Sequence, residues 1–162
     1  MAKKASRRGH KAQVNQAKSI TNRRARHDYE LGDSLVVGLE LTGAETKSLR
    51  MGHGQLRGAY VTVKGNELYL LNATVHGSPG IPVPENIQSR TRKLLAKRRE
   101  IDALTAAKTT GRTIVPLEIL TQGRYIKIRL AVGKGKKNWD KRETLKQRDD
   151  DRSAQRAMRA KQ

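Results

Sequence analysis

The sequence contains no cysteine and no phenylalanine, and aromatic residues make up only 3% of its 162 residues. Without cysteine, the chain has no disulfide bond, no thiolate zinc site, no iron–sulfur cluster and no cysteine nucleophile. It has no run of about 18 apolar residues that would span a membrane. The basic N-terminus is not followed by the apolar segment of a secretory signal. We therefore expect a soluble, cytoplasmic protein.

Positive charge is in excess: 35 Lys and Arg stand against 15 Asp and Glu, a formal charge of +20. Residues 1–27 carry nine basic residues and no acid, residues 90–112 eight basic and two acidic, and residues 134–162 eleven basic and five acidic. Residues 28–89 carry four basic and seven acidic residues. This distribution predicts a polyanionic partner, and we expect nucleic acid rather than a membrane surface.

Large apolar residues follow the opposite distribution. Neither end of the chain has enough of them to offset the entropy lost on ordering. We therefore predict a disordered basic head at residues 1–19, a folded body at residues 20–132, and a basic C-terminal tail at residues 133–162 that is disordered in the free protein.

Alternation of apolar and polar residues predicts strands, because such a strand buries one face. The predicted strands are residues 35–41, 60–64, 67–75, 113–120 and 125–132. Gly65-Asn66 suits a tight hairpin turn between the second and third strands. Pro116 indicates an edge or a bulge in the fourth.

Two helices are expected between these strands. Thr42 and Glu45 have the spacing of a capping box, which begins a short helix that continues to Met51. Residues 89–108 are predicted to form the second helix. Short antiparallel strands with inserted helices in about 110 residues most often close into a barrel, since closure removes exposed edges. The predicted fold is therefore mainly β with inserted helices: a small antiparallel OB-like β-barrel with flexible basic N-terminal and C-terminal tails.

The sequence gives no support for an enzyme. Its four histidines lie far apart, without metal-ligand spacing. The segment 133–137, Gly-Lys-Gly-Lys-Lys, lacks the features of a Walker A loop. It is either a flexible segment that lies along a nucleic-acid backbone or a simple linker. The run Asp149-Asp150-Asp151 is read as charge balance in a solvated helix rather than a Mg²⁺ site. We expect no catalysis, no cofactor and no metal.

A folded RNA is the expected nucleic acid, held by shape and phosphate contacts. Proteins that grip single strands present several aromatic stacking platforms, and this chain has few aromatic residues. One predicted RNA-contacting cluster is Asn22, Arg23, Arg24, Arg26 and His27, and the other is Arg90, Arg92, Lys93 and Arg98. The alternative for either cluster is a solvated charged face.

Five segments, taken in order, resemble the SmpB family, the small protein B that binds transfer-messenger RNA. The segments are residues 22–29, 38–50, 90–101, 113–117 and 133–142. The resemblance covers nearly the whole chain, from Asn22 to about Arg159. It implies an OB-like barrel that binds the transfer-RNA-like domain of transfer-messenger RNA (SsrA) and delivers it to stalled ribosomes. We expect a monomer, one per RNA.

The resemblance assigns an RNA contact to Asn22 and to Leu95, and the predicted RNA-binding set joins these to basic and aromatic residues of the same segments. The RNA-binding set is Asn22, Arg23, Arg24, Arg26, His27, Tyr29, Lys47, Arg50, Arg90, Arg92, Lys93 and Leu95. The tail is implied to enter the empty messenger channel, to contact small-subunit ribosomal RNA at the decoding centre, and to become helical there. Its ribosome-interacting set is Lys134, Gly135, Lys136, Lys137, Trp139, Asp140, Lys141, Arg142, Met158 and Arg159. Val36 departs from the family pattern, which has Glu at that position and uses it for RNA binding.

Three other functions remain open on the residues alone. A ribosomal protein or a general basic translation factor with an OB-like barrel has a similar composition. A nonspecific cationic protein would bind DNA and RNA equally. A metal-dependent nuclease would need clustered carboxylates in the folded body, and the sequence shows no convincing cluster.

Overall fold

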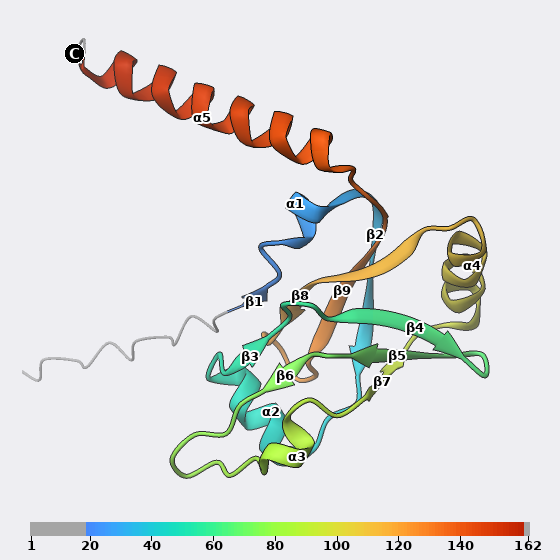
Figure 1. Ribbon diagram of the computed structural model, residues 1–162. Helices are drawn as coiled ribbons and strands as arrows, with labels where there is room; N and C mark the ends of the chain where they lie inside the picture. The colour runs from blue at the N-terminus through green and yellow to red at the C-terminus, as the bar shows by residue number, and fades with distance from the viewer. Residues whose placement is uncertain (1–18, 161–162) are drawn as a thin grey trace, which may run out of the picture.

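The computed structural model describes residues 19–160, whose strands close into an antiparallel barrel (Figure 1). The barrel strands follow the order β8-β4-β5-β7-β2-β9, and β9 pairs back with β8. Their bounds are β2 Tyr29–Leu39, β4 Tyr60–Lys64, β5 Glu67–Leu71, β7 Arg92–Leu95, β8 Thr113–Leu120 and β9 Lys127–Gly135. The predicted small barrel with inserted helices is confirmed.

Three short strands lie outside this ring. Strand β1 (Ile20–Thr21) pairs with β8, while β3 (Gly54–Gln55) and β6 (Thr74–Val75) form a separate two-stranded sheet. The barrel interior is apolar because alternate residues of each strand point inward. Its most deeply buried members include Leu49, Leu68, Leu70, Ile128 and Leu130.

The predicted hairpin is confirmed between β4 and β5. Gly65 and Asn66 both have positive φ, 57° and 64°, as a type I′ turn requires. The return strand ends at Leu71 rather than at the predicted Val75, because Asn72 turns the chain with a φ of 56°. An edge or a bulge was predicted at Pro116, and the register shift between Pro116 and Glu118 shows the bulge.

Helix α2 (Gly43–Arg50) begins at the predicted capping box. The Glu45 backbone N–H donates to Thr42 Oγ1 at 3.3 Å, and the Thr42 N–H donates to Glu45 Oε2 at 2.8 Å. A further helix, α1 (Ala25–Asp28), was not predicted. It is one turn long, too short to leave a periodic signal.

The single helix predicted over residues 89–108 is wrong. The chain forms α3 (Glu85–Gln88), then strand β7, and only then α4 (Arg98–Thr109). In β7, Arg92 and Leu94 are buried while Leu95 is exposed, so the segment has a period of two with an arginine on its buried face. Helix α4 starts where the Lys97 N–H donates to Glu100 Oε2 at 2.7 Å.

The glycine–lysine segment is part of the barrel rather than a linker. Strand β9 continues to Gly135, pairing Gly133 with Leu31 and Gly135 with Tyr29 of β2. A Cβ atom at Gly133 would lie 3.1 Å from Tyr29 Cβ and 3.2 Å from the Glu30 carbonyl oxygen, so glycine permits this close pairing. The folded body therefore extends beyond the predicted boundary at residue 132.

Helix α5 (Asn138–Ala160) leaves the barrel beside α1 and projects away from it (Figure 1). The predicted disorder of this segment in the free protein stays a prediction. The predicted head, apart from Ser19, lies outside the described residues. Among residues 19–160, no helix is both long and apolar enough to cross a membrane.

Candidate nucleic-acid interface

The first surface of the candidate interface is a groove of about 370 Å³ beside α1, which we call the α1 groove. It brings three residues of the predicted RNA-binding set together with two that the sequence did not indicate: Asn22, Arg24 and Tyr29 with Arg57 and Tyr60. Asn22 is fixed because its Nδ2 donates to the Pro116 carbonyl oxygen at 3.0 Å and its backbone N–H donates to Leu117 O at 2.7 Å.

Exposed cations gather on the segment around α1, and one of them, Arg24, lines the α1 groove together with Asp28. Arg23, Arg24 and Arg26 all face solvent, and no described carboxylate lies within ion-pair distance of them. His27 differs, since its Nδ1 lies 3.0 Å from Asp28 Oδ1. Three exposed guanidinium groups within four residues suit phosphate contacts, because guanidinium N–H groups bind phosphate oxygens in pairs.

Nothing in the sequence was a reason to select Arg57 or Tyr60, because Arg57 has no other basic residue next to it and Tyr60 has no other aromatic residue next to it. Tyr60 is nevertheless 42% exposed, which is unusual for an aromatic residue in a barrel strand. A usable signal existed: Val61 belongs to the apolar face of β4, so the neighbouring Tyr60 must face outward.

The second surface is a row of outward-facing residues across three strands, which we call the Gly38 row. Leu95 of β7 pairs with Gly38 of β2, which pairs in turn with Lys127 of β9. Directly opposed residues share a face, so all three face outward. Leu95 is 54% exposed, and a Cβ atom at Gly38 would lie 3.1 Å from Leu95 Cβ. The glycine therefore leaves a shallow floor between an apolar and a cationic side chain.

The hollow above the Gly38 row has a volume of about 620 Å³. Lys97 and Lys127 line it, and no described carboxylate lies within ion-pair distance of either ammonium group. Two acids line it as well: Glu67 is paired with Lys93, and Glu100 accepts the Lys97 backbone N–H. Val36, 41% exposed, lies on the same outer face two residues before Gly38. An apolar floor bordered by lysines suits a nucleotide, whose base favours apolar contact and whose phosphate favours ammonium groups.

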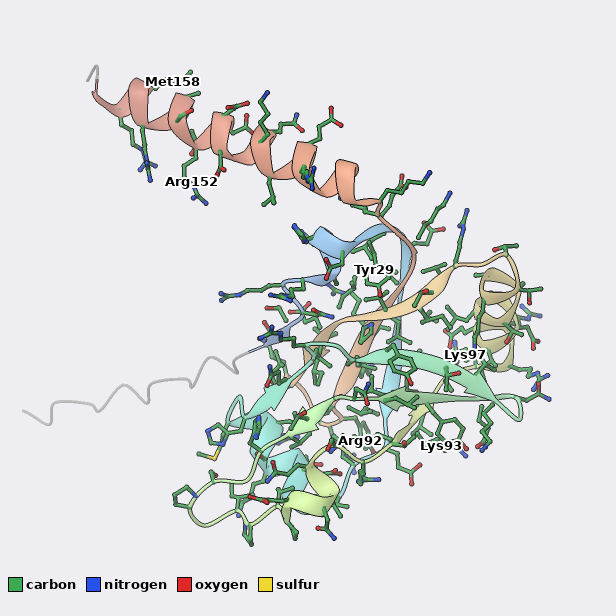
Figure 2. The ribbon with its side chains drawn as sticks, in the orientation of Figure 1. Tyr29, Arg92, Lys93, Lys97, Arg152 and Met158 are labelled. Atoms are coloured by element: carbon green, nitrogen blue, oxygen red, sulfur yellow. The ribbon has the colours of Figure 1, made fainter. Side chains whose placement is uncertain are left out.

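Arg92, predicted to bind RNA, is buried and unavailable; that prediction is wrong. Its side chain is 1% exposed and lies inside the body (Figure 2). Its Nε donates to Glu45 Oε1 at 3.0 Å, and its Nη1 and Nη2 donate to the carbonyl oxygens of Ala73 and Gln88, both at 2.7 Å. The guanidinium thus ties α2, β7 and the segment around α3 together.

Arg90 completes this buried cluster, which we call the Glu45 cluster. Its Nε and Nη2 donate to Glu45 Oε1 at 2.9 Å and Oε2 at 2.6 Å. Burial alone would raise the pKa of Glu45, but the hydrogen bonds from Arg90 and Thr42 and the charges of Arg92 and Arg90 lower that pKa to about 2. Glu45 is therefore ionised at neutral pH, and Arg90, with a side chain 33% exposed, is largely committed to it.

Lys93, next to Arg92, faces the other side of β7 (Figure 2). Its Nζ is paired with Glu67, and Tyr69 OH donates to Glu67 Oε2 at 2.7 Å. The hydrogen bonds from Lys93 and Tyr69 lower the pKa of Glu67, and the one to Glu67 raises the pKa of Lys93. Lys93 is thus exposed in part but already neutralised.

Two predicted residues lie on α2. Lys47 is exposed, and no described carboxylate lies within ion-pair distance of it. Arg50 is also exposed, but its Nη2 donates to the carbonyl oxygens of Gly123 and Arg124 at 3.2 and 3.1 Å. Arg50 therefore holds the loop between β8 and β9 in place.

The predicted tail residues lie at the end of β9 and along α5. Lys134 and Gly135 are exposed, and the Lys136 backbone N–H donates to the Asp28 carbonyl oxygen at 2.9 Å. Arg142, Met158 and Arg159 are exposed on α5, which carries them away from the barrel (Figure 2). The side chains of Trp139, Asp140 and Lys141 lie outside the described set. The described residues contain no group of three or more His, Asp or Glu side chains arranged to hold a metal ion.

Comparison with known proteins gives one consistent result. The family model described as SmpB protein matches residues 19–160. A protein of Microcystis aeruginosa named SsrA-binding protein is 43% identical over 151 residues, covering 90% of this chain and 97% of the relative. One of Streptomyces avermitilis with the same name is 43% identical over 141 residues, covering 86% of this chain and 79% of the relative.

A solved structure agrees with these relatives. It is described as "tmRNA-SmpB: a journey to the center of the bacterial ribosome", and it superposes with a TM-score of 0.62 at 36% sequence identity. The match covers 74% of this chain and 85% of the solved chain. Because the family model spans the barrel and α5 together, the chain belongs to the SmpB family.

Proposed function

We propose that this protein binds the transfer-RNA-like domain of transfer-messenger RNA with its barrel and delivers that RNA to stalled ribosomes in the cytoplasm. Helix α5 then acts in the decoding centre and the empty messenger channel. The protein contributes binding and positioning and carries out no reaction of its own. The observation that carries the proposal is the family match over residues 19–160, which includes both the barrel and α5.

The surface of the barrel supports this proposal. The segment around α1 offers exposed Arg23, Arg24 and Arg26, and the hollow above the Gly38 row is lined by Lys97 and Lys127 beside exposed Leu95. Cations of this kind release counterions when they neutralise RNA phosphates, so the affinity falls steeply with salt. The apolar atoms of Leu95 supply contacts that salt does not weaken, which favours one folded RNA over polyanions in general.

A competition experiment tests the choice of RNA. Labelled transfer-RNA-like domain is bound to the full chain at about 150 mM salt, where nonspecific binding is weak. Unlabelled transfer-messenger RNA is expected to displace it at far lower concentration than bulk transfer RNA or duplex DNA. Equal displacement by all three would contradict the proposal and favour a nonspecific cationic protein.

A truncation separates the two proposed roles. The cut belongs after Lys137, because β9 pairs with β2 through Gly135 and a cut before Gly133 would remove part of the barrel. The truncated chain is expected to bind the RNA domain with unchanged affinity and to fail in ribosome rescue. A chain with all eleven tail cations but a scrambled order of residues 138–162 is the control for charge alone.

A further inference from the structure

The loop between β8 and β9 presents an aromatic ring to solvent. Tyr125 in this loop is 68% exposed, against 42% for Tyr60. The guanidinium carbon of Arg124 lies over the Tyr125 ring, 5.4 Å from its centroid. This distance is that of a cation–π contact, in which one ring face is covered by the arginine. Because the side chain is so exposed, the other face is open.

The loop is held in place. Arg50 of α2 donates to the carbonyl oxygens of Gly123 and Arg124, at 3.2 and 3.1 Å. The chain turns at Gly123, whose φ of 90° favours glycine, and buried Thr121 and Ile126 fix the two sides of the turn. A ring presented on a fixed loop loses little conformational entropy when a ligand stacks on it.

The surroundings of the ring are cationic. A groove of about 500 Å³ runs beside it and is lined by Arg124, Lys127 and Arg129. Glu118 is the acid that lines it, and Glu118 already pairs with Arg129 at 3.2 Å. No described carboxylate lies within ion-pair distance of Arg124 or Lys127, so both can neutralise a phosphate.

This groove adjoins the Gly38 row. Lys127 lines both the groove beside Tyr125 and the hollow above Gly38. In the sheet, Lys127 pairs with Gly38 on one side and with Leu120 on the other, where β8 leads into the loop. An RNA strand bound on the Gly38 row can therefore also contact the Tyr125 ring, because Lys127 alone separates the two surfaces.

We propose that Tyr125 is a stacking site for one unpaired RNA base, whose phosphates are bound by Arg124 and Lys127. Arg50 acts as a positioning residue for this site. The inference rests on the proposed function, since it takes RNA as the partner, and it adds a contact beyond the predicted set. Stacking on a tyrosine already covered by arginine suits any base, because every base has a π face.

The test replaces the ring without changing charge. Tyr125→Leu is expected to weaken binding roughly tenfold, as the loss of one stacked base does, while Tyr125→Phe stays within about twofold. Met51→Ala is the matched control, because Met51 is a comparably exposed apolar residue, at 55%, and is expected to have no effect. Two RNA probes are used: the transfer-RNA-like domain of transfer-messenger RNA, and vacant ribosomes.

The two probes identify the source of the base. Loss of affinity for the RNA domain assigns the base to transfer-messenger RNA, and loss for ribosomes alone assigns it to ribosomal RNA. A Tyr125→Trp, Trp139→Phe chain reports stacking directly, through quenching of its indole fluorescence at saturating RNA. Unchanged affinity of Tyr125→Leu for both probes, without quenching, overturns the inference. Failure of the proposed function gives a different result from failure of the Tyr125 inference. If the proposed function is wrong, the unmodified chain shows no preference for the RNA domain over bulk transfer RNA.

Discussion

Two arginine-rich segments look alike in the sequence and differ in the fold. Around α1, Arg23, Arg24 and Arg26 face solvent without a described acidic partner. In and before β7, Arg92 is buried against Glu45 and Arg90 is bound to the same carboxylate by two hydrogen bonds. The first segment keeps its charge available for RNA, whereas the second uses its charge to join parts of the barrel.

The difference comes from an acid that lies far away in the sequence. Glu45 is 45 residues from Arg90 and 47 from Arg92. It is placed between them because the capping box of α2 orients its side chain. A count of local charge therefore overstates the RNA-binding capacity of the second segment, since buried ion pairs leave little field outside.

The largest expected effect comes from removing the buried arginine. Arg92→Met removes the guanidinium donor from the carbonyl oxygens of Ala73 and Gln88 and leaves Arg90 as the one cation bound to Glu45. Breaking a buried pair in this way costs about 3–5 kcal/mol. Urea unfolding should show this loss, and RNA affinity should fall only where the chain unfolds. Wild-type stability with lost RNA binding would show that Arg92 acts at the surface after all.

The second largest expected effect is the loss of stability of the Glu45 cluster at acid pH. The folded pKa of Glu45 is about 2, below its ordinary value of 4.5, so the stabilisation is fully present above pH 4.5 and is lost as the pH falls toward 2. The free energy of unfolding should decline by about 3 kcal/mol over that window. Glu45→Gln should remove most of this acid dependence while lowering stability at pH 7. A similar acid slope in the variant would assign the effect to other carboxylates.

At α1 the expected effect is on binding rather than on stability. Arg24→Ala and Arg26→Ala should each weaken binding of the transfer-RNA-like domain and reduce the slope of log affinity against log salt by about 1. Unfolding free energies should stay within about 0.5 kcal/mol of wild type, because both side chains are exposed. If the slope of log affinity against log salt is unchanged in these variants, Arg24 and Arg26 do not contact phosphates.

The smallest expected effect is at Lys93. This lysine is already paired with Glu67, so Lys93→Ala should change RNA affinity by less than about twofold and leave the melting temperature nearly unchanged. Lys97→Ala is the matched comparison on the other side of Leu95, and should weaken binding more. A stronger effect at Lys93 than at Lys97 would reverse the assignment of free and neutralised charge.

Features that depend on neighbouring residues could be predicted from the sequence. The tight hairpin turn at Gly65-Asn66, the capping box at Thr42 and the edge or bulge at Pro116 were all predicted from local backbone requirements, and the structure has a turn, a capping box and a bulge at these positions. The barrel followed from the number and spacing of strands, because antiparallel edges must be paired.

Features that depend on distant partners could not be predicted. Residues 89–108 looked like one helix because a buried arginine at a strand position breaks the apolar alternation that marks a strand. The availability of each cation depended on Glu45 and Glu67, which only the fold brings close. Arg57 and Tyr60 join the α1 groove through the arrangement of strands rather than through any motif of their own.

The junction between β9 and α5 sets the reach of the molecule. Strand β9 ends at Gly135 and α5 begins at Asn138, and of the two residues between them Lys136 is fixed by its backbone to Asp28. With 23 residues rising about 1.5 Å each, α5 extends about 35 Å from this junction. Adding or deleting residues within it would shift its far end by known steps of length and rotation about its axis. The number of residues in α5, as much as their identity, therefore specifies which distant atoms Met158 and Arg159 can touch.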